Sequence, residues 1–190
     1  AVWMAAHEFM PWASRLGLTE RIDEAVFDYA LAWLKTNAGP ICINVSAQSV
    51  CDVQLTARYQ HALQRQPQLA ARIWIDIPEF AAYRHSSAFR EFCAALKPLG
   101  CRIGLEHVGN QIGHMGELYD VGIDYLKIDS AIIRDIDQNP GNQAFLRGVC
   151  TIAQTMGMMS IAEGVMNQQE AGCLRTLGFK GMTGPGIVLA

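Results

Sequence analysis

The feature that most constrains the fold is a regular alternation of short apolar segments with longer helical ones. Five short runs have the length and apolar content of buried strands, and FKGMTG is a candidate sixth: 41–46, 71–77, 101–106, 123–129, 158–163 and 179–184. The segments between them have helical spacing or length: 20–35, 52–66, 80–97, 113–120, 141–156 and 167–177. Strands that alternate with helices predict a parallel sheet with right-handed crossover connections.

The first of these helices has the clearest pattern. Its apolar residues recur at helical spacing: Ile22, Val26, Phe27, Ala30, Leu31 and Leu34. We expect Thr19 to be its N-cap, and Pro98 and Gly100 to end the helix at 80–97.

The strands are apolar on both faces, which fits a sheet or barrel that is covered on both sides. A doubly wound sheet usually has a glycine-rich phosphate loop after its first strand, and the sequence has neither GxGxxG nor GxxxxGK[ST]. We therefore predict an α/β fold of the TIM-like (β/α)8 barrel type. Such barrels need about 250 residues, so we expect residues 1–190 to form a single domain that lacks the first part of the barrel.

Composition excludes several other classes of protein. Hydrophobic residues make up 51% of the chain and charged residues 17%, which argues against disorder. The net charge is −3 and no basic run occurs, so neither DNA nor RNA is an expected partner. The six cysteines are scattered singly, which argues against a structural zinc site. Most of them lie in apolar stretches, so we expect reduced thiols in the core and a cytoplasmic location. No apolar run is long enough to span a membrane.

Polar side chains lie where five consecutive predicted strands end. They are Asn44 and Ser46, Asp76 and Glu79, Glu106 and His107, Lys127 and Asp129, and Glu163. Each has a simple alternative reading, because an acid at a strand end often caps the next helix, and a lone lysine or histidine is commonly a paired charge or a turn residue. Barrel enzymes, however, build their sites at the carboxyl ends of the strands. Their joint occurrence favours one site with metal-assisted phosphate chemistry, in which carboxylate and amide oxygens suit magnesium or manganese.

Six separated segments resemble an EAL domain, the barrel family of cyclic di-GMP phosphodiesterases. They are INVSAQS, IDIPEF, RIGLEHVGNQIG, VGIDYLKID, SIAEGV and LGFKGMTG, in the family's order and spacing. The opening FMPWASRLGLTERID resembles the helical segment that follows the family's namesake motif, which would lie before residue 1.

The resemblance assigns a role to each polar position. It implies metal-binding positions at Asn44 and Asp76, a loop-supporting acid at Glu79, the paired aspartates of the DDFGTG motif at Glu106 and His107, the catalytic lysine at Lys127, a further acid at Asp129, and the AEGV glutamate at Glu163. An acid of the family falls on Met166 and a glutamine on Thr183.

The departures from the family pattern decide the functional prediction. Asp76 is one methylene shorter than the family's glutamate, Glu106 is longer than aspartate, and His107 offers nitrogen in place of carboxylate oxygen. Two-cation cleavage needs both ions held by several carboxylates, and magnesium demands near-ideal oxygen geometry. We therefore expect vestigial metal positions at Asn44, Asp76, Glu106 and His107, and vestigial catalytic positions at Glu106, His107, Lys127 and Glu163.

Binding demands less than cleavage does. The resemblance implies a degenerate, LapD-like receptor type that binds cyclic di-GMP through Asn44, Asp76, Glu79, Glu106, His107, Lys127, Asp129, Glu163 and Thr183. Such a receptor requires no cofactor, and we do not expect it to depend on magnesium or manganese. It would be a cytoplasmic domain of an inner-membrane protein that signals through a homodimer, a partner or another domain of the same protein. Two alternatives stay open: a slow or specialised phosphodiesterase in which His107 ligates manganese, and an interaction module that no longer binds nucleotide.

Overall fold

The computed structural model describes residues 4–187 and divides the chain into two compact units, which are considered one at a time. The first contains the chain up to Ile77 together with Ala81–Arg102, and the second contains Pro78–Phe80 and the chain from Ile103 onward.

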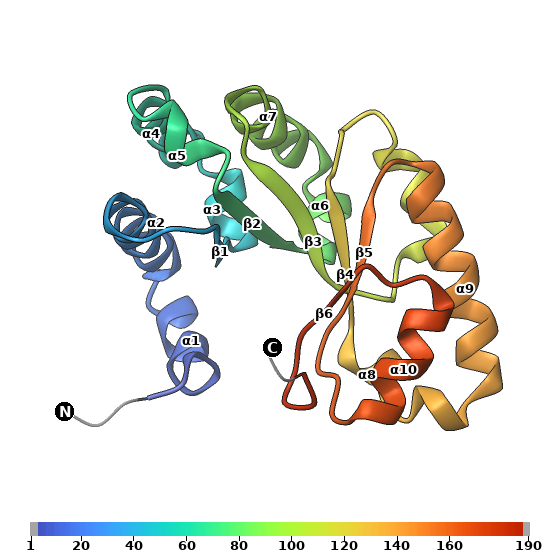
Figure 1. Ribbon diagram of the computed structural model, residues 1–190. Helices are drawn as coiled ribbons and strands as arrows, with labels where there is room; N and C mark the ends of the chain where they lie inside the picture. Colours follow the sequence, from blue (N-terminus) through green and yellow to red (C-terminus); the bar gives the residue numbers. More distant parts are fainter. Residues whose placement is uncertain (1–3, 188–190) are drawn as a thin grey trace. The chain divides into compact units, whose positions relative to one another are not determined.

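The first unit holds two parallel strands and most of the early helices, labelled in Figure 1. Its elements are α1 (Ala6–Arg15), α2 (Thr19–Thr36), β1 (Ile41–Asn44), α3 (Ala47–Cys51), α4 (Val53–Gln64), α5 (Pro67–Ala70), β2 (Ile73–Pro78), α6 (Glu79–Arg84), α7 (Ser86–Leu96) and the 3-10 turn η1 (Lys97–Leu99). The last residue of β2 and the first two of α6 belong to the second unit. Helix α2 packs against β1, and α4 packs against both α2 and α7. The strands pair in parallel with Asn44 opposite Asp76.

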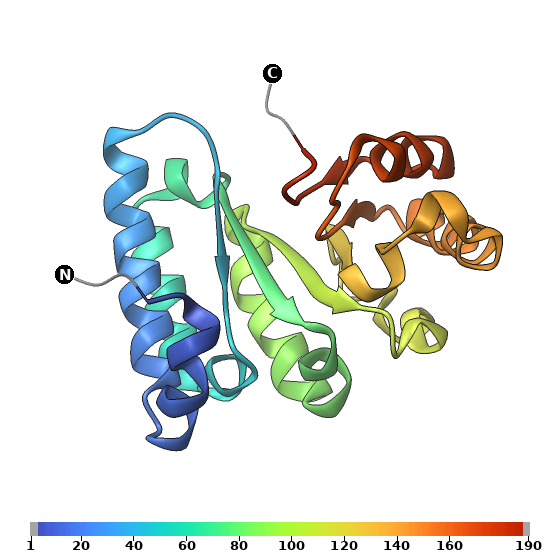
Figure 2. The ribbon, with the colours of Figure 1, turned by 90° about the horizontal axis from the view of Figure 1, so that it is seen from below.

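The second unit holds four parallel strands in the order β3, β4, β5, β6. Its elements are β3 (Arg102–Val108), the 3-10 segment η2 (Ile112–Leu118), β4 (Tyr125–Ile128), α8 (Ser130–Ile133), η3 (Ile136–Gln138), α9 (Pro140–Thr155), β5 (Met159–Ala162), α10 (Gln168–Leu177) and β6 (Gly181–Met182). Helix α9 packs on β5 and against α10, and Figure 2 shows these two helices together beside the strands. The predicted parallel α/β architecture is thus observed in each unit.

Several element boundaries differ from the predictions. Thr19 is not the N-cap of α2: the Leu18 carbonyl already accepts the first helical hydrogen bond, from Ile22 N at 3.0 Å, so Thr19 lies inside the helix. The predicted strand at 41–46 stops at Asn44, because Ser46 caps α3 by accepting a hydrogen bond from Ser49 N.

The single helix predicted at 80–97 is wrong. The chain breaks at His85, whose φ of −124° and ψ of 44° are not helical, into α6 and α7. Helix α7 then ends at Leu96, because the next residues form a 3-10 turn that closes at the left-handed Gly100.

A buried acid organises the start of the first unit. Asp23 on α2 is 6% exposed, and its Oδ2 accepts hydrogen bonds from Ser46 N at 2.9 Å and Ser49 Oγ at 2.6 Å. The carboxylate therefore joins α2 to the N-terminus of α3, directly after β1. A helix dipole favours a negative charge at this position.

All six cysteines are free thiols, but the prediction that most are core residues holds only in part. Cys93, Cys101 and Cys150 are buried, whereas Cys42 and Cys51 are exposed. Burial raises the pKa of the Cys150 thiol. Within residues 4–187, no helix is both long and apolar enough to cross a membrane.

Candidate functional site

The candidate site is built around a bulge in β3. Leu105 faces Leu126 and Val108 faces Ile128, so two residues of β3, Glu106 and His107, stand opposite Lys127 alone. An extra residue of this kind bends a strand and re-aims a side chain, and such bulges are frequent beside active sites. Glu106 and His107 therefore both lie inside β3, whereas the predicted strand at 101–106 ended at Glu106 and left His107 directly after it.

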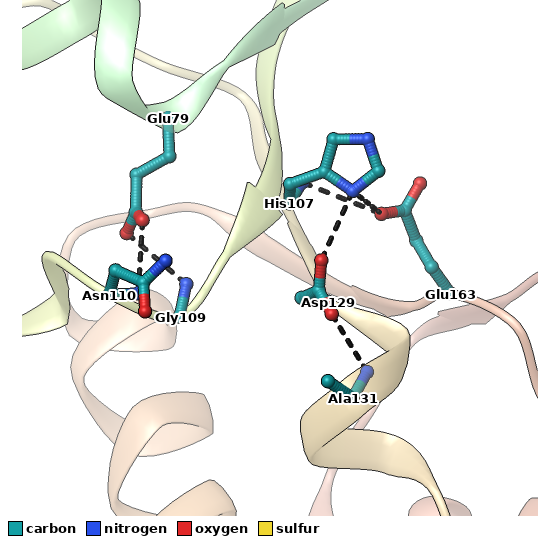
Figure 3. Close-up of polar contacts among 7 residues, drawn as sticks. All are labelled: Glu79, His107, Gly109, Asn110, Asp129, Ala131 and Glu163. Carbon is teal, nitrogen blue, oxygen red and sulfur yellow. Dashed lines mark hydrogen bonds and ion pairs between the residues drawn. The ribbon is translucent and has the colours of Figure 1, made fainter. Parts of the chain in front are cut away.

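The bulge places His107 in the left-handed region, with φ of 54°. Residues other than glycine adopt this conformation rarely, and histidine, asparagine and aspartate do so more readily than most. The imidazole is consequently directed at the ends of the two following strands, as Figure 3 shows.

Two carboxylates converge on that imidazole. Nδ1 of His107 lies 3.2 Å from Oδ2 of Asp129 and 3.7 Å from Oε2 of Glu163. The backbone N–H of His107 also donates to Oε2 of Glu163 at 3.5 Å. The imidazole is 64% exposed, and the Asp129 and Glu163 side chains are 32% and 18% exposed, so the cluster is open to solvent on its histidine side.

Each acid is positioned by the backbone of its own strand end. Asp129 follows β4 and caps α8, since its Oδ1 accepts a hydrogen bond from Ala131 N at 2.7 Å. The simple capping interpretation of this acid is therefore correct for one of its oxygens, while the other faces His107. Glu163 follows β5, and its N–H donates to the Ile128 carbonyl at 3.1 Å.

A close backbone approach completes this arrangement. Gly164 has φ of 68°, and a Cβ built on it would lie 2.7 Å from the Cβ of Ser130. Ser130 follows Asp129 and Gly164 follows Glu163, so the contact brings the two acids together. Only glycine fits both the conformation and the space.

A second carboxylate holds the loop that leaves β3. Glu79 is 5% exposed, and its two oxygens accept hydrogen bonds from the backbone N–H groups of Gly109, Asn110 and Gln111 at 3.1–3.2 Å. Figure 3 shows the carboxylate above Gly109 and Asn110. These contacts are of the kind expected from the loop-supporting role that the resemblance implies for Glu79.

Lys127 and Thr183 belong to the same unit. Lys127 lies in β4 opposite Ile161 of β5, and it shares a strand face with Asp129 because side chains alternate along a strand. Thr183 directly follows β6, and its side chain is exposed.

Asn44 and Asp76 lie in the first unit as neighbours across β1 and β2. Asp76 is 1% exposed, and the Cys42 thiol donates a hydrogen bond to its Oδ2 at 3.0 Å. Asn44 is exposed at the end of β1. Within residues 4–187, leaving His7 aside, no group of three or more His, Cys, Asp or Glu side chains has the arrangement of a metal site.

One buried acid of the second unit was not singled out from the sequence. Glu170 is 1% exposed and accepts hydrogen bonds from the N–H groups of Met166 and Asp135 at 2.7 and 2.9 Å. It thereby fixes the segment directly after Glu163. The available signal was the pattern of Asn167, a helix cap, followed three residues later by an acid.

The strands of the second unit are parallel, and carboxylates, a lysine and a histidine lie at or near their carboxyl ends. A polar site in this position is typical of α/β domains of the barrel type. Residues 2–188 match the family model described as the EAL domain, and the chain belongs to this family. The predicted fold class, an α/β TIM-like barrel of the EAL type, is thereby confirmed.

Similar proteins were found among curated sequences. The chain is 27% identical over 181 residues to the cyclic di-GMP phosphodiesterase PdeF of Escherichia coli, covering 93% of this chain and 24% of PdeF. It is 27% identical over 184 residues to the cyclic di-GMP phosphodiesterase PdeB of Shewanella oneidensis, covering 93% of this chain and 21% of PdeB. The chain thus spans about a quarter or less of the length of these relatives.

Solved structures share the fold. The S helix-GGDEF-EAL portion of Vibrio cholerae LapD superposes with a TM-score of 0.89 at 19% identity, over 97% of this chain and 46% of that one. The FimX EAL domain of Xanthomonas citri, in complex with cyclic di-GMP, gives a TM-score of 0.87 at 23% identity, over 96% of this chain and 74% of that one.

Proposed function

We propose that this EAL domain binds cyclic di-GMP as a receptor and does not hydrolyse it. The observation that carries the proposal is the bulge in β3, where the imidazole of His107 faces Asp129 and Glu163. By the resemblance, Glu106 and His107 stand where the family has its paired aspartates.

The residues at the bulge do not fit a magnesium centre. Magnesium takes oxygen ligands in near-ideal octahedral geometry, and His107 presents a nitrogen directed at the two acids. An Nδ1–H in this position uses acceptor capacity of the carboxylates that a cation would otherwise use. The longer acid at position 106 changes the donor set further.

Binding of the dinucleotide is supported by what this chain retains. Lys127 supplies a positive charge for phosphate, and Asn44, Asp129 and Glu163 supply groups that hydrogen-bond guanine edges or ribose. EAL domains of the same fold have been solved with cyclic di-GMP bound, as in the FimX complex. The PdeF and PdeB relatives are phosphodiesterases of the same dinucleotide.

The experiment for this proposal is an incubation of the full-length protein with cyclic di-GMP in magnesium and, separately, in manganese, followed by chromatography. We expect intact cyclic di-GMP in both. Linear pGpG in magnesium would refute the proposal. Product in manganese alone would favour the specialised phosphodiesterase, in which histidine serves as a transition-metal ligand.

We further propose that ligand binding changes a homodimer or a partner contact, as in a signalling domain located in the cytoplasm. Light scattering of the full-length protein with and without cyclic di-GMP measures the first of these. If the mass did not change, the ligand would have to act through a partner contact and not through a homodimer.

The Glu163→Ala variant should bind cyclic di-GMP roughly tenfold or more weakly, since losing a hydrogen bond to a charged group costs about 1.5–3 kcal/mol. The matched control is Glu117→Ala, an exposed acid of the same unit whose side chain is 65% exposed. Calorimetric titration of both variants measures the difference. Equal affinities would show that Glu163 lies outside the ligand site.

A further inference from the structure

His107 occupies the point at which two negative charges converge. Oδ2 of Asp129 and Oε2 of Glu163 both approach its Nδ1, and Oε2 also approaches its backbone N–H. Like charges brought this close repel each other unless a cation or a hydrogen-bond donor stands between them. His107 approaches both acids, with its ring nitrogen near each carboxylate and its backbone N–H near Glu163, and Figure 3 shows dashed lines from Nδ1 to both carboxylates.

We propose that His107 is a positioning residue that takes the place of a cation. Its ring N–H and backbone N–H hold Asp129 and Glu163 in the arrangement that receives the dinucleotide, so that the site forms without metal. This inference rests on the proposed function and deepens it, because it gives a physical reason to expect that cyclic di-GMP binds this chain without divalent cations.

The backbone supports this role independently of the side-chain contacts. His107 keeps a left-handed conformation within a strand, and such strain is kept only when the surroundings impose it. The bulge opposite Lys127 and the close approach of Gly164 to Ser130 impose it here, since both fix the strand ends that carry the two acids. The backbone N–H of His107 is thus held at Glu163 by the strand itself.

The left-handed conformation also selects the variants for a test. Aspartate and asparagine tolerate it better than most residues, so neither substitution introduces a large backbone penalty. His107→Asp replaces the donor with a third carboxylate, whereas His107→Asn keeps an N–H donor on a shorter side chain. The matched control is His114→Asp: that imidazole is 62% exposed and lies 2.8 Å from Oε1 of Glu117, a comparable histidine–acid pair elsewhere in the unit.

The experiment is calorimetric titration of cyclic di-GMP into each full-length protein, once in EDTA and once in millimolar calcium. Calcium is chosen because it accepts irregular carboxylate geometry. We expect wild-type and His114→Asp affinities to agree within about twofold between the two buffers, and His107→Asp to bind at least about tenfold more weakly in EDTA and to recover in calcium. His107→Asn should lose less affinity than His107→Asp and should show no recovery in calcium.

The outcomes separate this inference from the function on which it rests. Absence of binding by the folded wild type in either buffer would refute the receptor function. Wild-type binding that requires calcium, or His107→Asp binding that equals wild type in EDTA, would refute the role of His107 and leave the receptor function intact. A purely structural role for His107 would weaken all its variants without any recovery in calcium, and this result would also overturn the inference.

Discussion

Replacing Glu79 with alanine should lower the free energy of unfolding by about 3 kcal/mol, because three backbone N–H groups lose their acceptor at once. A single unsatisfied buried donor costs about 1–3 kcal/mol, and partial hydration of the half-buried loop keeps the total below the sum of three such losses. Urea denaturation followed by circular dichroism measures the loss. The loop at 109–111 should also become accessible to protease, since Glu79 is its anchor.

Two further variants make this prediction specific. Glu79→Gln keeps one carbonyl acceptor but turns an NH₂ group toward backbone donors, so its stability should fall between wild type and Glu79→Ala. Glu91→Ala removes an exposed acid of α7 that interacts with the Ser87 hydroxyl at 3.3 Å, and should change stability by less than about 0.5 kcal/mol. A Glu79→Ala protein as stable as Glu91→Ala would show that the carboxylate does not hold the loop.

The Gly164→Ala substitution should destabilise the protein by about 3 kcal/mol through two separate effects. The left-handed conformation costs an alanine about 1–2 kcal/mol, and the overlap with the Ser130 Cβ adds about 1–3 kcal/mol. Cyclic di-GMP affinity should fall as well, since any shift at Gly164 moves the neighbouring Glu163 away from Asp129. Urea denaturation and calorimetry measure the two consequences.

A second glycine separates the two effects of that substitution. Gly157 has φ of 77°, and a Cβ added there would have no neighbouring atom within 4 Å, so Gly157→Ala carries the conformational cost alone. Adding Ser130→Gly to Gly164→Ala removes the contacted Cβ and should restore part of the lost stability. If Gly164→Ala were no worse than Gly157→Ala, the close approach between these two strand ends would have no energetic consequence.

The order of strands and helices was predictable because apolar periodicity reports burial directly. Phe27, Ala30, Leu31 and Leu34 form the buried face of α2 as expected, but Val26 is 40% exposed. A residue at the edge of an apolar stripe is buried only if a neighbouring element covers it, and local periodicity does not contain that information.

The polar positions were predictable as a group, since each lies at or near the carboxyl end of a strand, but their geometry was not. The bulge depends on the register between β3 and β4, a property of two strands that neither sequence segment specifies alone. Asp23 and Glu170 were missed for a related reason. An acid on a helix is normally solvated, and the fold shows that these two instead accept hydrogen bonds from backbone N–H groups outside their own helices.

The central claim is that the strand ends of this chain retain the groups that bind a cyclic dinucleotide but do not retain the donor set that holds catalytic cations. Calorimetric titration of cyclic di-GMP into the full-length wild-type protein, with all divalent cations removed by EDTA, tests it most directly. We expect saturable heat of binding and intact dinucleotide recovered from the calorimeter cell. A folded protein that gives no heat until magnesium is added, and then converts the dinucleotide to pGpG, would contradict it.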